Sequence, residues 1–166
     1  ALAGRGQLHQ RLRHGEDLAG SVVFVRFGGR LEHVCRSSIA TLVAAWRQVS
    51  LDGPPSAIVS LSAGHTEMLY AIGAGDQVIA ADAYSDCPAA AADLPHLDAF
   101  SPSVESIVAL ESDLVIIFFD PGGLVEALES AGVRSLVLEA PDSVDAVFDQ
   151  MELLGEVTGH PEGASD

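Results

Sequence analysis

One stretch, residues 57–88, constrains the fold more than any other part of this sequence. It begins with a short apolar run, residues 57–61, of the kind found in strands that are buried on both faces. A helical pattern follows, with Ser62 placed to cap the helix and Gly73 placed to end it. A second apolar run starts at Val78. This order of strand, helix and strand predicts a βαβ unit with two parallel strands.

The same alternation continues to the end of the chain. We expect further strands near Leu97 and over residues 114–119 and 133–139. We expect helices over residues 89–92 and 124–130, a helix that begins at Pro102 with Ser101 as its cap, and a final helix capped by Asp142 or Ser143. Strands that alternate with helices form parallel sheets with helices on both faces. The sequence therefore predicts an α/β fold, a three-layer Rossmann-like parallel sheet.

Charge divides the chain into two unequal parts. Residues 1–55 hold seven arginines and four acidic residues, whereas residues 56–166 hold Arg134 and twenty acidic residues. Such an acidic body disfavours nucleic acid and anionic lipid, whose binding depends on cationic side chains. It suits either a cationic partner or a well-solvated surface. No run is long and apolar enough to cross a membrane, and no secretory signal is visible in this chain.

Residues 1–55 form an atypical N-terminal segment. They are rich in arginine and show no sustained hydrophobic period, so we expect low order over residues 1–50. Within them, residues 21–27 are compatible with a strand and residues 38–49 with a helix around Trp46. A proline- and glycine-containing linker then leads into the domain at residues 56–166.

A resemblance to one protein family is carried, in order, by residues 59–61, 64–67, 71–76, 84–88, 104–110, 113–116, 131–133 and 154–159. The segment from Glu105 to Val115 is similar to the family's pattern E-x-I-x-A-L-x-P-D-L-V, with Ser112 where a proline is usual. The ordered set resembles the substrate-binding proteins of cobalamin and iron–siderophore ABC importers.

The resemblance implies that residues 56–166 are the N-terminal lobe of a two-lobed class III periplasmic binding protein, ending before the second lobe. Such proteins hold their ligand between two lobes joined by a long helix, and residues 159–162 resemble the entrance to that helix. The expected ligand is cobalamin, a ferric siderophore or haem, and the expected partner is the permease of the importer. The implied location is extracytoplasmic, either periplasmic or as a membrane-anchored lipoprotein.

Four residues near the predicted strand ends are candidates for ligand binding. His65 and Thr66 lie at the start of the first helix, where side chains and backbone N–H groups can meet a polar ligand edge or simply cap the helix. The resemblance implies that Tyr84 and Phe100 face a flat ligand; packing on the sheet rim or the core is the alternative for both.

Glu105 is the candidate for permease docking. The resemblance implies that a glutamate at this motif position pairs with permease arginines, and the alternative is a glutamate that only complements a helix dipole. Asp86 is more readily a turn cap than a ligand contact, and His96 more readily a loop histidine than a metal or haem ligand.

Catalysis has little support in the sequence. It contains no Gly-x-Ser-x-Gly elbow, phosphate-binding glycine loop or His/Cys cluster with metal spacing. We therefore expect a binding protein with no intrinsic cofactor and no metal site. Two alternatives stay open: a Rossmann-like nucleotide or redox enzyme, and an acidic protein-interaction domain.

Overall fold

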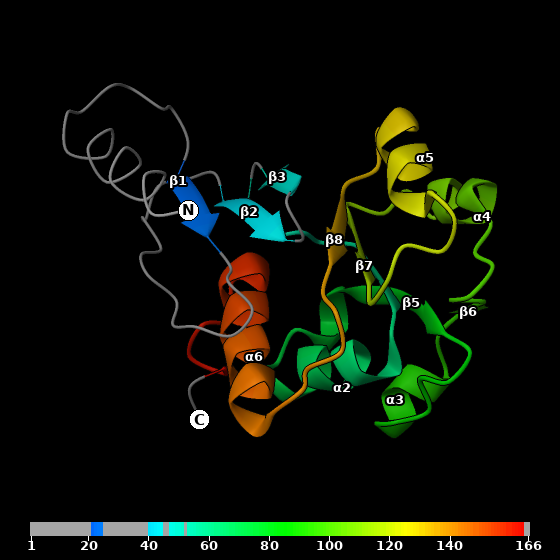
Figure 1. Ribbon diagram of the computed structural model, residues 1–166. Coiled ribbons are helices and arrows are strands. Elements are labelled where there is room, and N and C mark those ends of the chain that lie inside the picture. Colours follow the sequence, from blue (N-terminus) through cyan, green and yellow to red (C-terminus); the bar gives the residue numbers. More distant parts are fainter. Residues whose placement is uncertain (1–20, 25–39, 45–46, 52, 165–166) are drawn as a thin grey trace, which may run out of the picture.

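The computed structural model describes residues 21–24, 40–44, 47–51 and 53–164, and its larger sheet confirms the predicted α/β fold. The five strands of this sheet are β4 (Ile58–Leu61), β5 (Val78–Asp82), β6 (His96–Leu97), β7 (Leu114–Ile117) and β8 (Ser135–Val137). They are all parallel and lie in the order β6-β5-β4-β7-β8. Because the strands are parallel, the loops that follow them gather at one edge (Figure 1).

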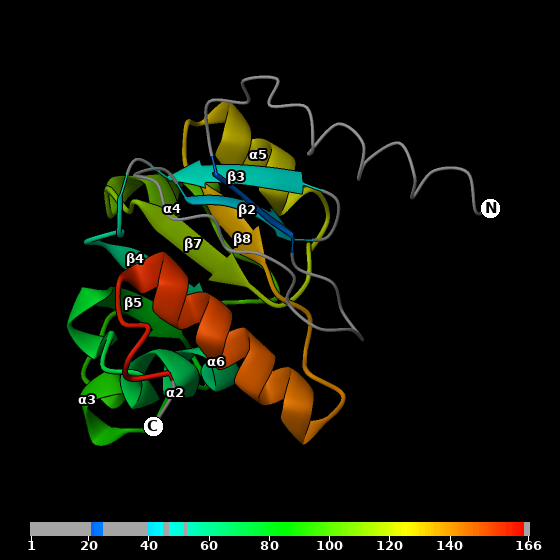
Figure 2. The same ribbon diagram turned by 90° about the vertical axis from the view of Figure 1, so that its left-hand side faces the viewer.

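Helices cover both faces of this sheet (Figure 2). They are α2 (Ala63–Ala71), the short 3-10 turn η1 (Gly75–Gln77), α3 (Ala89–Ala92), α4 (Val104–Ala109), α5 (Leu124–Ser130) and α6 (Val144–Thr158). On one face, α2 and α6 pack over Ile58, Leu114 and Ile116. On the other, α4 and α5 pack over Val59, Val115 and Ile117. Successive side chains of β4 and β7 therefore enter the two cores on opposite faces of the sheet. This explains why the sequences of both strands are apolar without a regular alternation of polar residues.

The N-terminal segment contributes a smaller sheet of β1 (Ser21–Phe24), β2 (Ala40–Ala44) and β3 (Arg47–Leu51). The helix expected over residues 38–49 is wrong, since β2 pairs antiparallel with β3 from Ala40↔Leu51 to Ala44↔Arg47. Leu51 is buried in the core beneath α2 and α6. Trp46 and most of residues 1–50 lie outside the described residues, so the low order expected for this segment stays a prediction.

Two predicted helix caps need correction. Ser62 occupies the N-cap position of α2 but its side chain makes no capping hydrogen bond. The helix expected at Pro102 begins instead at Val104, where Ser103 Oγ accepts the Ser106 N–H at 3.2 Å. The Ser101 N–H is bonded to Asp98 Oδ1 at 3.2 Å, which holds that residue in a turn instead of at a helix cap. None of the helices in the described ranges is long and apolar enough to span a membrane.

Candidate functional site

Four aromatic residues meet beyond the ends of three strands of the larger sheet, of which β5 and β6 are neighbours and β7 lies across β4 from them. Tyr84 follows β5, Phe100 follows β6, and Phe118 and Phe119 follow β7. The Phe100 ring lies 6.3 Å from Tyr84, 6.0 Å from Phe118 and 5.8 Å from Phe119, measured between centroids. The rings of Phe118 and Phe119 are 4.4 Å apart. These four residues, here called the aromatic surface, thus form one connected group with Phe100 at its centre.

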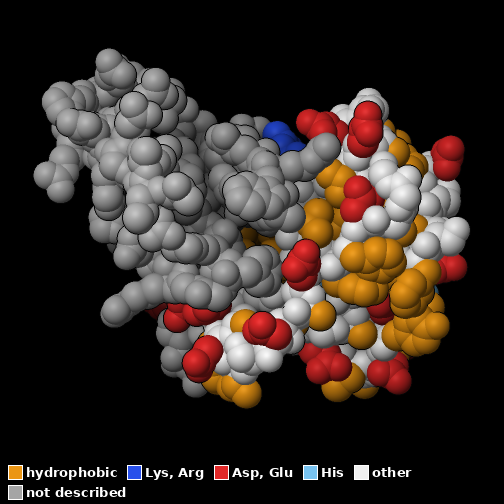
Figure 3. Space-filling view, viewed as in Figure 1, with side chains coloured by type: hydrophobic (Ala, Val, Ile, Leu, Met, Phe, Trp, Pro, Cys, Tyr) orange, Lys and Arg blue, Asp and Glu red, His pale blue; other side chains and the backbone are white. Residues whose placement is uncertain are grey.

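Tyr84 and Phe100 are the exposed part of the aromatic surface, whereas Phe118 and Phe119 are half-buried and Phe118 packs against the core beneath α4 and α5. Tyr84 is 67% exposed and Phe100 is 58% exposed, although both are large and apolar. In the space-filling view, apolar side chains gather on the right-hand side of the molecule, with acidic side chains around them (Figure 3). Large aromatic side chains grouped at a surface are typical of binding sites, because their exposure to water is unfavourable.

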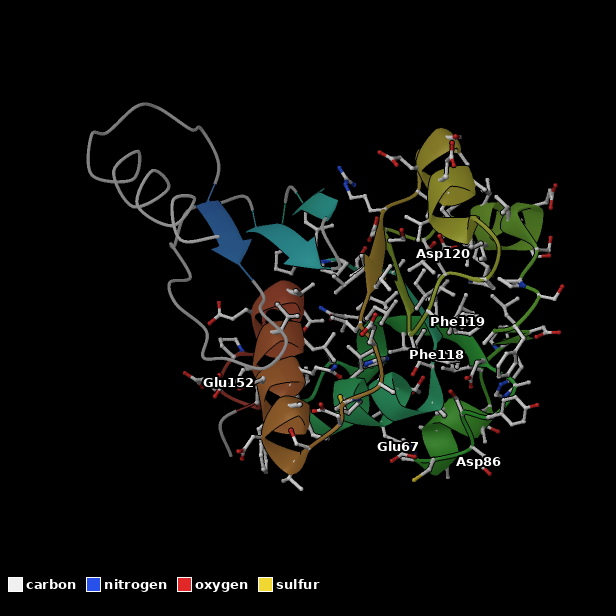
Figure 4. All side chains as sticks on the ribbon, in the orientation of Figure 1. Glu67, Asp86, Phe118, Phe119, Asp120 and Glu152 are labelled. Carbon is white, nitrogen blue, oxygen red and sulfur yellow. The ribbon has the colours of Figure 1, made fainter. Side chains whose placement is uncertain are left out.

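Phe118 and Phe119 are site residues that sequence reasoning missed. They were assigned to the central strand, but β7 ends at Ile117, and the next two side chains stand at the sheet edge before Asp120 (Figure 4). The signal available in the sequence was the turn at residues 120–123, which follows the two aromatic residues directly.

His65 is not part of the aromatic surface, because its side chain faces α6. The side chain is buried, and its Nε2 is 3.0 Å from Oε1 of Gln150 on α6. Gln150 Nε2 in turn donates to the Glu139 carbonyl at 2.8 Å. This arrangement requires His65 Nε2 to be the donor, and the buried Nδ1 has no hydrogen-bond partner among the described residues. Burial therefore lowers the pKa of His65, and the bond to Gln150 only partly opposes that shift.

Thr66 is also buried, in a chain of hydroxyl groups. Its Oγ1 lies 3.0 Å from the Ser62 carbonyl oxygen and 2.8 Å from Ser60 Oγ. Ser85 Oγ lies 3.0 Å from Thr66 Oγ1 and 2.7 Å from the carboxylate of Asp82. The chain therefore connects β4, the start of α2 and the turn after β5. Of the four predicted ligand residues, the structure brings Tyr84 and Phe100 together at the surface and buries the side chains of His65 and Thr66.

Glu105 lies in the first turn of α4 and is fully exposed. Its own backbone N–H and the hydroxyl of Ser103, which donates to Glu105 Oε2 at 3.0 Å, lower the pKa of this carboxyl group. The side chain is therefore ionised at neutral pH and free to meet a cation.

His96 is held by two backbone carbonyl groups. Its Nδ1 lies 2.6 Å from the Asp82 carbonyl oxygen and its Nε2 lies 3.2 Å from that of Ala92, at the end of α3. The two carbonyl groups raise the pKa of His96, because only the protonated ring can donate to both. Within the part of the chain that the structure describes, no group of three His, Cys, Asp or Glu side chains is arranged to hold a metal ion.

Acid is expected to destabilise the fold through His65. The unfolded chain takes up a proton there near the ordinary pKa of 6.5, whereas the folded chain does so only at the lowered pKa. His65→Leu should therefore flatten the fall in the free energy of unfolding between pH 7 and about pH 5, measured by urea denaturation. His96→Gln should instead steepen this fall in the free energy of unfolding, because the raised pKa of His96 makes that residue stabilising in acid. An unchanged slope in His65→Leu would contradict the buried, neutral state.

Comparison with known proteins gives the following relationships. Residues 58–166 match the family described as periplasmic binding protein. The vitamin B12-binding protein of Yersinia pestis (strain Pestoides F) is 33% identical over 110 residues, which cover 64% of this chain and 39% of that protein. This chain therefore spans well under half the length of the curated relatives that it matches.

Two solved structures share the fold. The periplasmic vitamin B12 binding protein BtuF of Vibrio cholerae superimposes with a TM-score of 0.61 at 29% identity, over 68% of this chain and 45% of that one. A periplasmic heme binding protein from Pseudomonas aeruginosa does so with a TM-score of 0.63 at 28% identity, over 67% and 41%.

Proposed function

We propose that this chain, which belongs to the periplasmic binding protein family, supplies one lobe of the substrate-binding component of an ABC importer for cobalamin, haem or another ferric chelate. The observation that carries the proposal is the aromatic surface of Tyr84, Phe100, Phe118 and Phe119 at the carboxyl ends of parallel strands. That edge is where proteins with open parallel sheets bind their ligands.

The chemistry of the aromatic surface favours a large and flat ligand. Corrin and porphyrin rings offer wide apolar faces, and aromatic side chains contact such faces at a low cost in conformational entropy. Phe100 is in contact range of the other three rings, so one flat ligand over Phe100 would cover the whole group. In this proposal Tyr84 and Phe100 contact the ligand directly, Thr66 supports the Tyr84 turn through Ser85, and His65 is a buried residue that holds α2 against α6.

The remaining parts of the proposal follow from the family. The protein acts outside the cytoplasm, in the periplasm or as a membrane-anchored lipoprotein, and delivers its ligand to a membrane permease. It binds its ligand without transforming it, so no side chain here is assigned a catalytic role. A second lobe would cover the ligand from the opposite side.

Ligand titration tests the proposal directly. Haemin, cyanocobalamin and a ferric hydroxamate siderophore are titrated into the purified chain, and binding is followed by absorbance and by quenching of tyrosine fluorescence. ATP and NAD serve as the controls for a nucleotide enzyme. We expect one of the three chelates to bind and the nucleotides to have no effect. Binding of a nucleotide alone, or of none of these compounds, would contradict the proposal.

Glu105 is proposed to dock the lobe on the permease. Its carboxylate is exposed and ionised, which suits pairing with arginine across an interface. In a two-lobed relative, arginine at the aligned position should reduce ligand transport by about tenfold or more while ligand affinity stays within a few-fold. A matched control is the residue aligned with Glu156, an exposed glutamate on α6. Equal losses of transport and affinity would count against docking.

A further inference from the structure

Two turns with the same sequence present two of the aromatic residues. The tetrapeptide Asp-Ala-aromatic-Ser occurs at residues 82–85, where β5 ends, and again at residues 98–101, directly after β6. β5 and β6 are parallel neighbours, and their register pairs Asp82 with Leu97. The two tetrapeptides therefore leave the same edge of the sheet side by side.

Each turn is closed by the same hydrogen bond. The Tyr84 N–H donates to Asp82 Oδ1 at 3.0 Å, and the Phe100 N–H donates to Asp98 Oδ1 at 2.9 Å. An aspartate that accepts the N–H two residues ahead fixes the backbone of the turn. The residue fixed in each case is the aromatic one, and the two rings meet edge to face at an angle of 82°.

The two turns differ in how firmly they are anchored. Asp82 is only 4% exposed, and its carboxylate is also 2.7 Å from Ser85 Oγ, which joins the buried hydroxyl chain through Thr66. Asp98 is exposed, and its second hydrogen bond comes from the backbone N–H of Ser101 at 3.2 Å. The Tyr84 turn is thus connected to β4 and α2, whereas the Phe100 turn is closed locally.

We propose that Asp82 and Asp98 are positioning residues for the ligand surface, each holding the backbone of one aromatic residue so that Tyr84 and Phe100 meet edge to face before any ligand arrives. The inference rests on the proposed function, because it assigns these carboxylates a role in ligand affinity. It also gives Thr66 a place in the site without ligand contact, since Thr66 acts on Tyr84 through Ser85 and Asp82.

The first test needs no ligand. Nuclear Overhauser contacts between the Tyr84 and Phe100 rings are measured by NMR in the unaltered chain and in D82A, D82N, D98A and D93A. We expect D82A and D98A to weaken the contact and D82N to keep it, because asparagine retains the Oδ1 acceptor. Asp93 is an exposed aspartate between the two turns, so D93A is the matched control. Because Asp98 is exposed, D98A tests the idea even where D82A does not fold, and an unchanged ring contact in D98A would overturn it.

The second test is a double-mutant cycle on affinity. Haemin and cyanocobalamin are titrated against D98A, F100A and D98A/F100A, and whichever probe binds is used throughout. We expect D98A to weaken binding by about three- to tenfold alone, and by less than about twofold in the F100A background, since Asp98 acts through Phe100. Equal effects in both backgrounds would overturn the inference. If neither of these probes nor the ferric hydroxamate siderophore binds the unaltered chain, the proposed function fails, and the NMR comparison still decides the positioning role.

Discussion

Replacing Phe100 with alanine is expected to weaken ligand binding by about 10- to 100-fold, the largest loss that we expect from any single change at the site. The reason is its central place, because its ring connects Tyr84 to Phe118 and Phe119. The fold should tolerate the change, since the Phe100 side chain is 58% exposed and contributes little to either core. The measurement is titration with haemin and cyanocobalamin, with far-UV circular dichroism to verify folding.

Phe148 offers a matched control for this prediction. It is a phenylalanine of similar exposure, 56%, on α6 and away from the aromatic surface. Phe148→Ala should leave affinity within about twofold of the unaltered chain, as is usual for changes outside a binding site. If both variants lose affinity equally, the aromatic surface is not the binding site and general hydrophobic adsorption explains the titration.

Replacing Gly163 with alanine is expected to lower the free energy of unfolding by about 1–3 kcal/mol. An added Cβ at this position would collide with the carbonyl group of Ile72, at the end of α2. The obstacle is backbone, so the clash cannot be relieved by rotating a side chain. Urea denaturation measures the effect.

Gly64 provides the comparison for this second prediction. It is an exposed position in α2 where an added Cβ meets nothing within 4 Å. Gly64→Ala should therefore be neutral or stabilising by up to about 1 kcal/mol, because alanine favours helix more than glycine does. A Gly163→Ala variant as stable as Gly64→Ala would show that residues 160–164 are not packed against α2.

The aromatic surface shows how far sequence reasoning reaches for this site. Tyr84 and Phe100 were named because the family resemblance implies an aromatic residue at each position, and both positions follow predicted strands, whose ends meet at one edge of a parallel sheet. Phe118 and Phe119 were missed because the apolar run itself does not mark where the strand stops pairing, and only the turn after it gives a signal. β7 ends at Ile117, which pairs with the last residues of both neighbouring strands, Leu61 of β4 and Val137 of β8.

For His65 and Thr66, the sequence did not show whether the side chains face a ligand or the interior. Their place at a helix start predicts contact with a ligand or with the helix itself, and local sequence does not distinguish the two. The deciding partners are distant in the chain: Gln150 lies 85 residues from His65, and Ser85 lies 19 residues from Thr66. Only packing of α6 and β5 against α2 turns both side chains inward.

The sequence by itself determined the alternation of strands and helices over residues 56–166, and with it the parallel sheet and the edge at which we propose the site. Hydrophobic periodicity and glycine positions are local properties, and they suffice for those conclusions. Tertiary structure alone decided that β2 and β3 pair where a helix was expected, that α4 starts after the Asp98 turn, and which polar groups are buried. Those outcomes depend on hydrogen-bond partners and packing surfaces supplied by other segments, and a pattern read along the chain does not contain them.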